Sequence, residues 1–311
     1  MPTHSRYAAI DIGSNAIRMV ISEFRDNKFH MIKKFRVPIR LGADVFDKGL
    51  IGAKHLKDAT MVFAKFKTYC DHYKVKEARA LGTSALRESQ NTAQFIDAIQ
   101  KKSGFHIQVI DGVEEAMLIH LAIRKDIHIE DSQALLIDIG GGSVELTFSD
   151  RGRMTSTQSF PYGTVRTLEK MKQRKISEDR INLIIAEYIE SLSHFLHSRS
   201  NPNKIDFMVG TGGNIEAIGK LKPILLNKAS KNLVSTKELE EILQKLRTMS
   251  HKERIEKLHM RPDRADVIVP AGTLVQAVMR QAQVEKLVIP GVGMKDGILW
   301  SILEKHEDMR L

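Results

Sequence analysis

Cysteine is almost absent from this sequence, which has Cys70 alone among 311 residues. A single cysteine excludes an intramolecular disulfide and a thiolate metal cluster, so neither can form the functional site. No apolar run approaches the roughly 18 residues that a membrane-spanning helix needs. The first expected strand begins by Tyr7, which leaves no room for a signal peptide. These absences predict a cytoplasmic protein that does not act at a membrane.

Aromatic residues are also few, at 6% of the chain, whereas the formal net charge is +10. A positive surface favours polyanionic partners. Single-stranded nucleic acids are usually bound by aromatic side chains interleaved with positive charge. Most of the aromatic residues here lie in apolar patterns, and a basic cluster such as residues 170–175 contains none. We therefore expect a polyanion other than a nucleic acid, although any one cluster is more simply a solvated surface.

The rest of the composition indicates a globular protein of two domains. Hydrophobic residues make up 42% and charged residues 28% of a chain that is longer than one core usually supports. Strand-like and helix-like segments alternate in both halves, which favours an α/β fold. Among the helices we expect one over 177–198, one capped by Asn91, and one that begins with a capping box of Ser235 and Glu238.

Two nearly identical glycine turns occur in the chain, Asp11-Ile12-Gly13-Ser14-Asn15 and Asp138-Ile139-Gly140-Gly141-Gly142-Ser143. Each follows a short apolar run and precedes an alternating segment, so each predicts a strand, a turn and a second strand. Glycine lets backbone N–H groups approach an anion, and the aspartate can hold a cation opposite them. The repeat predicts two domains of related topology, with a cleft between them that clamps a metal-bound phosphate chain.

Other interpretations of the glycines are weaker. A P-loop needs a lysine after its last glycine, and neither turn has one. The segments 210–215 and 291–297 do not have the spacing of a dinucleotide fingerprint. Ordinary hairpins would explain each turn by itself, but they would not explain why the second turn repeats the first in register.

These motifs resemble the exopolyphosphatase/guanosine pentaphosphate phosphatase (Ppx/GppA) family, which shares a superfamily with acetate and sugar kinases, the heat-shock ATPase and actin. The matching segments run in order through nearly the whole chain. Besides the two turns they are Arg40-Leu41-Gly42, Gly82-Thr83-Ser84-Ala85-Leu86-Arg87, Glu114-Glu115-Ala116, Gly163-Thr164-Val165-Arg166, Gly210-Thr211-Gly212-Gly213 and Arg264-Ala265-Asp266. The resemblance implies two actin-like (ribonuclease H-like) α/β domains with an interdomain cleft, residues 1–124 with 295–311 and residues 125–294.

The resemblance also implies Mg²⁺-dependent removal of the terminal phosphate from inorganic polyphosphate, guanosine pentaphosphate or both. Glu115 would be the general base, while Asp138 and Glu145 would hold the Mg²⁺ with help from Asp11. Adjacent residues of a helix project about 100° apart, so only one of the two glutamates can easily face the substrate. The family pattern selects Glu115. Without it, an acidic pair favoured by the helix dipole is the better interpretation of Glu114 and Glu115.

The resemblance further implies a set of polyanion-binding residues. Arg87 can bind a phosphate through two N–H groups, although an exposed arginine beside Glu88 is an equal alternative. Arg18 and Arg264 are candidates for contacts to a guanosine tetraphosphate or pentaphosphate. The expected phosphate-binding residues are Gly13, Ser14, Asn15, Ser84, Arg87, Gly140, Gly141, Gly142, Ser143, Gly212 and Lys295. The expected partner is thus polyphosphate or a guanosine penta- or tetraphosphate, and a homodimer is left open.

Some positions depart from the family's pattern. Asp111 stands in place of a serine and adds a negative charge near the site, Lys295 stands in place of an arginine, and Ala16 removes a hydroxyl. The end at Leu311 indicates a short member without the C-terminal helical domain of long members. Two alternatives stay open: a sensor that binds polyphosphate or guanosine tetraphosphate without turnover, and a kinase or ATPase of the same superfamily.

Overall fold

The computed structural model describes residues 5–198 and 205–308. The parts of the expected domains at 1–4, 199–204 and 309–311 lie outside the described residues. The chain forms two compact units, residues 1–122 with 292–311 and residues 123–291, which we call unit 1 and unit 2. The domain limits expected at residues 124 and 294 stay a prediction about which segments fold independently.

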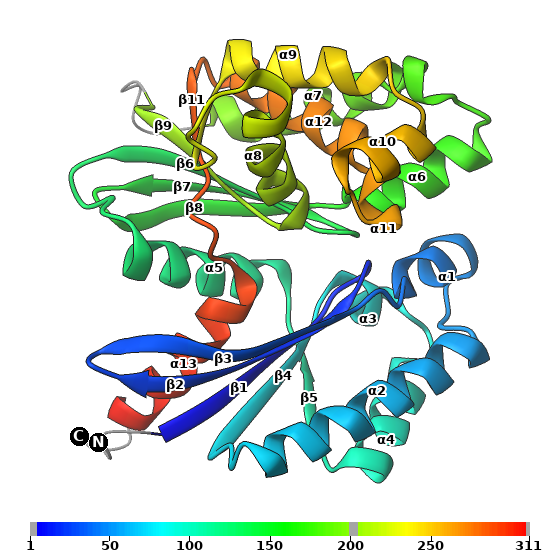
Figure 1. Ribbon diagram of the computed structural model, residues 1–311, viewed down its shortest axis with the longest axis vertical. Coiled ribbons are helices and arrows are strands. Elements are labelled where there is room, and N and C mark those ends of the chain that lie inside the picture. Colours follow the sequence, from blue (N-terminus) through cyan, green and yellow to red (C-terminus); the bar gives the residue numbers. More distant parts are fainter. Residues whose placement is uncertain (1–4, 199–204, 309–311) are drawn as a thin grey trace. The chain divides into compact units, whose positions relative to one another are not determined.

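Unit 1 is built on a five-stranded mixed sheet (Figure 1). The strands are β1 (Ser5–Ile12), β2 (Ile17–Arg25), β3 (Lys28–Val37), β4 (Glu77–Gly82) and β5 (Ile107–Val109), in the order β3-β2-β1-β4-β5. β1, β2 and β3 are antiparallel neighbours, whereas β4 and β5 continue the sheet in parallel. Ile10 and Ile12 of β1 belong to the hydrophobic core. Because side chains alternate along a strand, Asp11 points to the opposite face.

Helices cover both faces of this sheet. They are α1 (Leu41–Lys48), α2 (Ala53–His72), α3 (Ser84–Glu88), α4 (Thr92–Ser103), the first part of α5 (Gly112–Asp126), and α13 (Met294–Asp308). Phe63 of α2 and Phe95 of α4 are fully buried against the core side of the sheet. Trp300 of α13 contacts the rings of Phe24 and Phe29. The last helix therefore packs on unit 1, with β1 among its neighbours.

Unit 2 contains a six-stranded mixed sheet. Its strands are β6 (Gln133–Ile139), β7 (Val144–Asp150), β8 (Arg153–Phe160), β9 (Phe207–Thr211), β10 (Leu233–Ser235) and β11 (Lys286–Val288), in the order β10-β11-β9-β6-β7-β8. β6, β7 and β8 form an antiparallel meander, and β9 and β11 run parallel to β6. The short β10 adds an antiparallel edge to β11.

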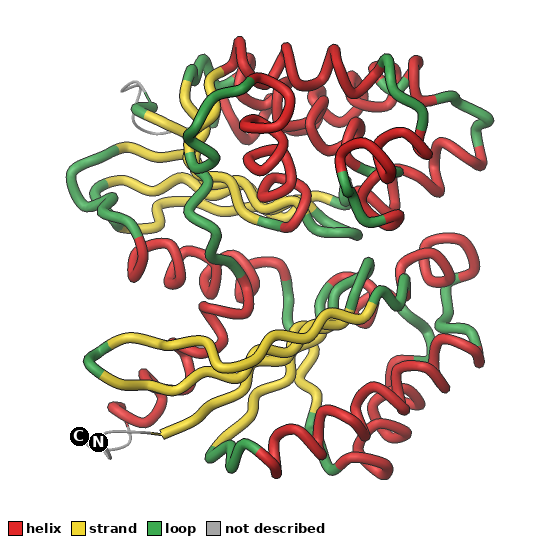
Figure 2. Tube along the Cα trace, in the orientation of Figure 1, coloured by secondary structure: helices red, strands yellow, loops and turns green. Residues whose placement is uncertain are grey.

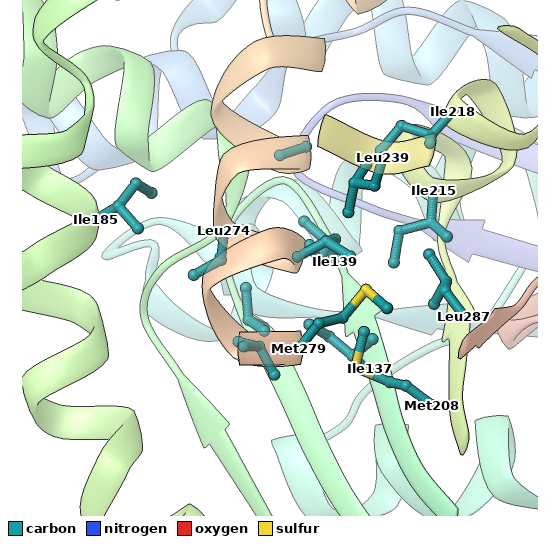
Figure 3. Close-up of a cluster of buried hydrophobic side chains, with 14 of the residues drawn as sticks. Ile137, Ile139, Ile185, Met208, Ile215, Ile218, Leu239, Leu274, Met279 and Leu287 are labelled. Carbon is teal, nitrogen blue, oxygen red and sulfur yellow. The ribbon is translucent and has the colours of Figure 1, made fainter. Parts of the chain in front are cut away.

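The core of unit 2 lies between this sheet and its helices. The helices are α6 (Thr164–Gln173), α7 (Asn182–His197), α8 (Gly213–Leu226), α9 (Thr236–Arg247), α10 (His251–Leu258), α11 (Pro262–Ala265) and α12 (Ile268–Gln281). Figure 3 shows Ile137 and Ile139 of β6 beside Leu274 and Met279 of α12. Such burial of aliphatic side chains is the main force that joins the helices to the sheet.

The two sheets share one plan. Starting from the edge strand of the antiparallel meander, the order β3-β2-β1-β4-β5 of unit 1 corresponds to β8-β7-β6-β9-β11 of unit 2, with the same strand directions. In both units the glycine turn joins the first two strands, as the sequence repeat predicted. Helices then alternate with the later strands of each unit (Figure 2). The expected α/β, actin-like architecture is thus confirmed. No helix in residues 5–198 and 205–308 combines the length and apolar character that crossing a bilayer requires.

Candidate active site

Both glycine turns close with the same hydrogen bond. In unit 1 the Gly13 N–H donates to the Ala16 carbonyl at 3.2 Å, and in unit 2 the Gly140 N–H donates to the Ser143 carbonyl at 3.0 Å. The repeat seen in the sequence is therefore a repeat of backbone conformation. Each turn connects two strands that pair with each other in the antiparallel direction.

The segment Arg40-Leu41-Gly42 supports the turn of unit 1. The Gly42 N–H donates to the Ser14 carbonyl at 2.9 Å, and Arg40 Nε donates to Asn15 Oδ1 at 3.1 Å. A Cβ on Gly42 would lie 2.8 Å from the Ser14 Cβ, so only glycine allows this approach. Ser14 is buried, and its Oγ has no hydrogen-bond partner within the described part of the chain. A hydroxyl in this state is available to an anion at the turn.

Asp11 and Arg18 form an ion pair beside the same turn. They are directly opposed in the β1–β2 register, and Arg18 Nη1 lies 3.0 Å from Asp11 Oδ2. Asp11 is nearly fully buried, whereas Arg18 is partly exposed. The structure thus joins two residues for which the sequence predicted separate roles, a metal ligand and a nucleotide contact. Arg18 has Arg36 as its partner on β3, so positive charge continues toward the sheet edge.

The first turn of α5 separates the two adjacent glutamates. Asp111 Oδ1 accepts the N–H groups of Val113 and Glu114, both at 2.8 Å, and the Asp111 N–H donates to Glu114 Oε2 at 3.3 Å. This reciprocal arrangement is a helix cap. Glu114 is consequently exposed at the cap, whereas Glu115 is only 6% exposed. Asp111, expected as a charge near the site, has a structural role that its sequence position did not reveal.

Arg87 lies next to Glu115. Its Nη1 donates to the Ile110 carbonyl at 2.8 Å and is 3.8 Å from Glu115 Oε2. The guanidinium therefore connects α3 with the segment that leads into α5. Ser84, at the start of α3, is buried and its Oγ donates to Glu88 Oε1 at 3.4 Å. Unit 1 thus brings Arg87 and Glu115 together, while Ser84 faces its own helix.

The turn of unit 2 is held by the N-terminus of α6. The Gly140 carbonyl accepts the Thr164 N–H at 3.0 Å, the Gly141 carbonyl accepts the Val165 N–H at 2.8 Å, and the Gly142 carbonyl accepts Arg166 Nε at 2.9 Å. A Cβ on Gly163 would lie 2.3 Å from the Gly142 nitrogen, so glycine is required where the helix meets the turn.

These bonds fix the direction of three successive amides in the turn. In a trans peptide the carbonyl and the following N–H point in opposite directions. Because the carbonyls of Gly140, Gly141 and Gly142 point to α6, the N–H groups of Gly141, Gly142 and Ser143 point away from it. None of these three N–H groups has an acceptor among residues 5–198 and 205–308. Aligned amides of this kind form an anion-binding nest.

Asp138 and Glu145 are opposed across the strands that flank this turn. They are register partners in the β6–β7 pair, and one oxygen of each lies within 4.8 Å of the other. Thr211 Oγ1 donates to Asp138 Oδ1, and Ser159 Oγ donates to Glu145 Oε1 at 2.7 Å. Two carboxylates held face to face repel each other, and a divalent cation would relieve that repulsion. Their oxygens are the ligands that Mg²⁺ prefers.

The remaining predicted residues lie at helix starts. Gly212, with φ of 90°, precedes α8, where Arg264 packs against Gly213 so closely that a Cβ there would lie 2.0 Å from Nη2. Lys295 is the second residue of α13 and forms an ion pair with Asp296, whose Oδ2 also accepts the Gly293 N–H at 2.8 Å. The lysine is thus held by the first turn of its own helix.

Sequence reasoning missed several residues that shape these groups. Ser159 orients Glu145 from β8, Arg40 holds Asn15, and Asn214 links Arg264 to α6. Arg40 could have been found from the sequence, because it belongs to the matching segment Arg40-Leu41-Gly42. Ser159 had none, because its position depends on the register between β7 and β8.

Comparison with known proteins identifies similar chains along nearly the full length. The model of the Ppx/GppA phosphatase family matches residues 20–306. Two relatives called guanosine-5'-triphosphate,3'-diphosphate pyrophosphatase, from Aliivibrio fischeri and Vibrio cholerae, are 23% and 24% identical over 97% and 98% of this chain. The chain spans 61% of the length of each of these relatives.

Solved structures share the fold. A Ppx/GppA family member from Aquifex aeolicus has a TM-score of 0.81 at 23% identity, with 97% of this chain and 99% of that chain covered. An exopolyphosphatase from Cytophaga hutchinsonii has a TM-score of 0.87 at 24% identity, with 97% and 98% covered.

Proposed function

The chain belongs to the Ppx/GppA phosphatase family, and we propose that it is a Mg²⁺-dependent hydrolase that removes the terminal phosphate from inorganic polyphosphate, guanosine pentaphosphate or both. The observation that carries this proposal is the turn of unit 2, where the three aligned amides of residues 141–143 lie between Asp138 and Glu145 in the chain. Amides bind phosphate oxygens, and the carboxylates suit the cation that accompanies a phosphate chain.

Asp138 and Glu145 are the residues assigned to Mg²⁺. Both offer hard oxygen ligands, and each is oriented by one hydroxyl, from Thr211 and Ser159. Bound there, Mg²⁺ would offset the negative charge of the phosphoryl oxygens. Asp11 is a secondary candidate, because its carboxylate would have to give up the Arg18 ion pair to reach the ion.

Glu115 is assigned as the base that orients and deprotonates the attacking water. The water oxygen bonds to the terminal phosphorus, the bridging P–O bond breaks, and the shortened chain leaves with the electron pair. Arg87, 3.8 Å from Glu115, and the cap formed by Asp111 hold the carboxylate in place. Arg87 has further N–H groups that can bind a phosphoryl oxygen and stabilise the charge of the transition state.

The phosphate chain is assigned to the turns and the nearby helix starts. The amides of Gly141, Gly142 and Ser143 would bind one phosphate, and the turn of unit 1, with the Ser14 hydroxyl, another. The expected contributions of Ser84, Gly212 and Lys295 are part of the same proposal. Arg18 and Arg264 are the proposed contacts that distinguish guanosine pentaphosphate from polyphosphate. The homodimer stays a prediction.

The test is phosphate release by the purified chain with Mg²⁺, using polyphosphates of several lengths, guanosine pentaphosphate and ATP in parallel. We compare Glu115→Gln with the matched control Glu114→Gln, which changes the neighbouring exposed glutamate. The expected result is release from polyphosphate or guanosine pentaphosphate, lost in Glu115→Gln and retained in Glu114→Gln. Release from ATP alone would support the kinase or ATPase alternative. Tight binding of a polyanion without any release would support the sensor.

A further inference from the structure

A chain of hydrogen bonds connects Arg264 with the glycine turn of unit 2. Arg264 Nη1 donates to Asn214 Oδ1 at 2.6 Å, and Asn214 Nδ2 donates to Thr164 Oγ1 at 3.3 Å. Thr164 Oγ1 then donates to the Gly140 carbonyl at 3.4 Å, and the Thr164 N–H donates to the same oxygen at 3.0 Å. The chain thus joins α11, α8, α6 and the turn that follows β6.

The direction of each bond in this chain is fixed by chemistry. Arginine has donors only, so the Asn214 oxygen must face Arg264 and its NH₂ must face Thr164. The Thr164 oxygen therefore accepts from Asn214, and its own hydrogen is left for the Gly140 carbonyl. All donors point the same way, from the guanidinium to the turn. Hydrogen bonds in such a series polarise one another.

The chain is buried and closely packed. Asn214 is 1% exposed and Thr164 is 2% exposed, so neither can exchange its partner for water. A buried polar group that loses its partner is costly. The Arg264 guanidinium occupies the space beside Gly213, because a Cβ there would lie 2.0 Å from Nη2. These features indicate a specific arrangement and not a chance surface contact.

The end of the chain reaches the peptide that presents the first anion-binding amide. The Gly140 carbonyl and the Gly141 N–H belong to one planar peptide, so donors to the carbonyl hold the N–H in the opposite direction. Polarisation of the carbonyl also makes the N–H a stronger donor. A change in Arg264, Asn214 or Thr164 would therefore alter an amide that none of the three side chains contacts.

We propose that Asn214 and Thr164 are positioning residues through which Arg264 acts on the phosphate-binding turn, in addition to any direct contact that Arg264 makes with a nucleotide. This inference takes one element from the proposed function, namely that the ligand is a phosphate chain. It predicts that Arg264 matters for a substrate without a nucleoside. A purely nucleotide-binding Arg264 would not affect such a substrate.

The experiment uses the full chain and inorganic tripolyphosphate as the probe. Thr164→Val removes the hydroxyl and keeps the branched shape, Thr164→Ser restores the hydroxyl, and Asn214→Asp keeps the acceptor for Arg264 but loses the donor to Thr164. We expect Thr164→Val and Asn214→Asp to weaken tripolyphosphate binding on the order of 3- to 10-fold, the effect of one hydrogen bond. Thr164→Ser should bind like the wild type.

A structural readout without ligand accompanies the binding measurement. The proton and nitrogen chemical shifts of the amides of residues 141–143 should differ from those of the wild type in both Thr164→Val and Asn214→Asp, because these shifts report the orientation and polarisation of the peptides. Thr167→Val is the control, since it removes another buried hydroxyl of α6 that bonds to Gly163 and not to the turn. It should leave the amide chemical shifts of residues 141–143 and the affinity unchanged.

A double-mutant cycle decides whether Arg264 acts through the chain. The loss of affinity caused by Arg264→Gln should largely disappear in the Thr164→Val background, because the connection is already broken. Unchanged amide chemical shifts at 141–143 in both Thr164→Val and Asn214→Asp overturn the inference. If the chemical shifts and the affinity change as expected while the wild type releases no phosphate, the positioning role stands and the hydrolase assignment fails.

Discussion

Glu145 lies directly opposite Asp138 in the β6–β7 pair, at the position that Arg18 takes opposite Asp11 in the β1–β2 pair. The same hairpin thus carries an ion pair in unit 1 and two carboxylates in unit 2. An ion pair balances its own charge, whereas two opposed carboxylates repel each other and a bound cation would offset that repulsion. The repeat is symmetric in backbone and asymmetric in charge, which favours unit 2 as the place where Mg²⁺ binds.

Replacement of Glu145 tests this difference. Without Mg²⁺, Glu145→Gln should stabilise the protein by about 0.2–1 kcal/mol, because repulsion between opposed like charges is removed. With Mg²⁺ the order should reverse. A ligand at 100 times its Kd stabilises the wild type by about 2.7 kcal/mol, and the variant should gain little. Thermal unfolding with EDTA and with Mg²⁺ measures both effects.

Asp150→Asn is the matched control for that experiment, because it removes a carboxylate from the far end of β7. It should keep the wild-type response to Mg²⁺. If Mg²⁺ stabilised Glu145→Gln as much as it stabilised the wild type, the ion would bind elsewhere.

The cap of α5 should contribute to stability. Asp111→Ala removes the acceptor for two amides of the first turn, and loss of a helix cap costs about 1 kcal/mol. Asp111→Ser, which restores the residue of the family pattern, should stay within about 0.5 kcal/mol of the wild type, since serine caps helices equally well. Urea unfolding of the three proteins checks this. Equal stability of the alanine and serine variants would contradict the capping role.

Gly163 should not tolerate a larger side chain. Its φ of −63° is one that any residue adopts, so the cost of Gly163→Ala would come from contact alone. The added Cβ would lie 2.3 Å from the Gly142 nitrogen, and relief of such overpacking typically costs about 1–3 kcal/mol. Gly293→Ala is the control, because nothing lies within 4 Å of the Cβ it would add. Denaturant melts should show a loss for Gly163→Ala and almost none for Gly293→Ala.

Acid stability should depend on Glu238. Burial by itself would raise the pKa of this carboxyl, but hydrogen bonds from Lys222, the Ser235 N–H and Lys228 lower the pKa from 4.5 to about 2. The folded state therefore favours the charged form. Its stabilising contribution is complete above pH 4.5 and is lost as the pH falls toward about 2.

Glu238→Gln should flatten this part of the stability profile. The variant should be less stable than the wild type near neutral pH, and the two should converge as the pH falls. Chemical unfolding between pH 2 and 7 measures the difference. Glu256→Gln removes an exposed carboxylate from unit 2 and should run parallel to the wild type. A constant difference between Glu238→Gln and wild type across the range would contradict the assignment.

Sequence patterns at helix starts predicted some of the observed caps and boundaries and not others. The capping box of Ser235 and Glu238 is confirmed, because its partners are only three positions apart in the chain. Asn91 is the N-cap residue of α4, as predicted, but its side chain makes no capping hydrogen bond: its Oδ1 accepts the Ile51 N–H at 2.8 Å, a partner forty positions away. The helix expected over 177–198 begins as α7 only at Asn182, because a short 3₁₀ turn occupies 178–180. Each difference came from contacts or geometry that the local pattern does not contain.

The sequence by itself determined the repeated strand–turn–strand unit, the α/β alternation and the membership of its motifs in one family, because these depend on residue types at short, fixed spacing. Tertiary structure alone decided which groups meet. Strand register opposed Asp138 to Glu145 and brought Ser159 beside it. The docking of α6 on the turn aimed three amides in one direction. Such pairings depend on how distant elements pack, and no local spacing specifies them.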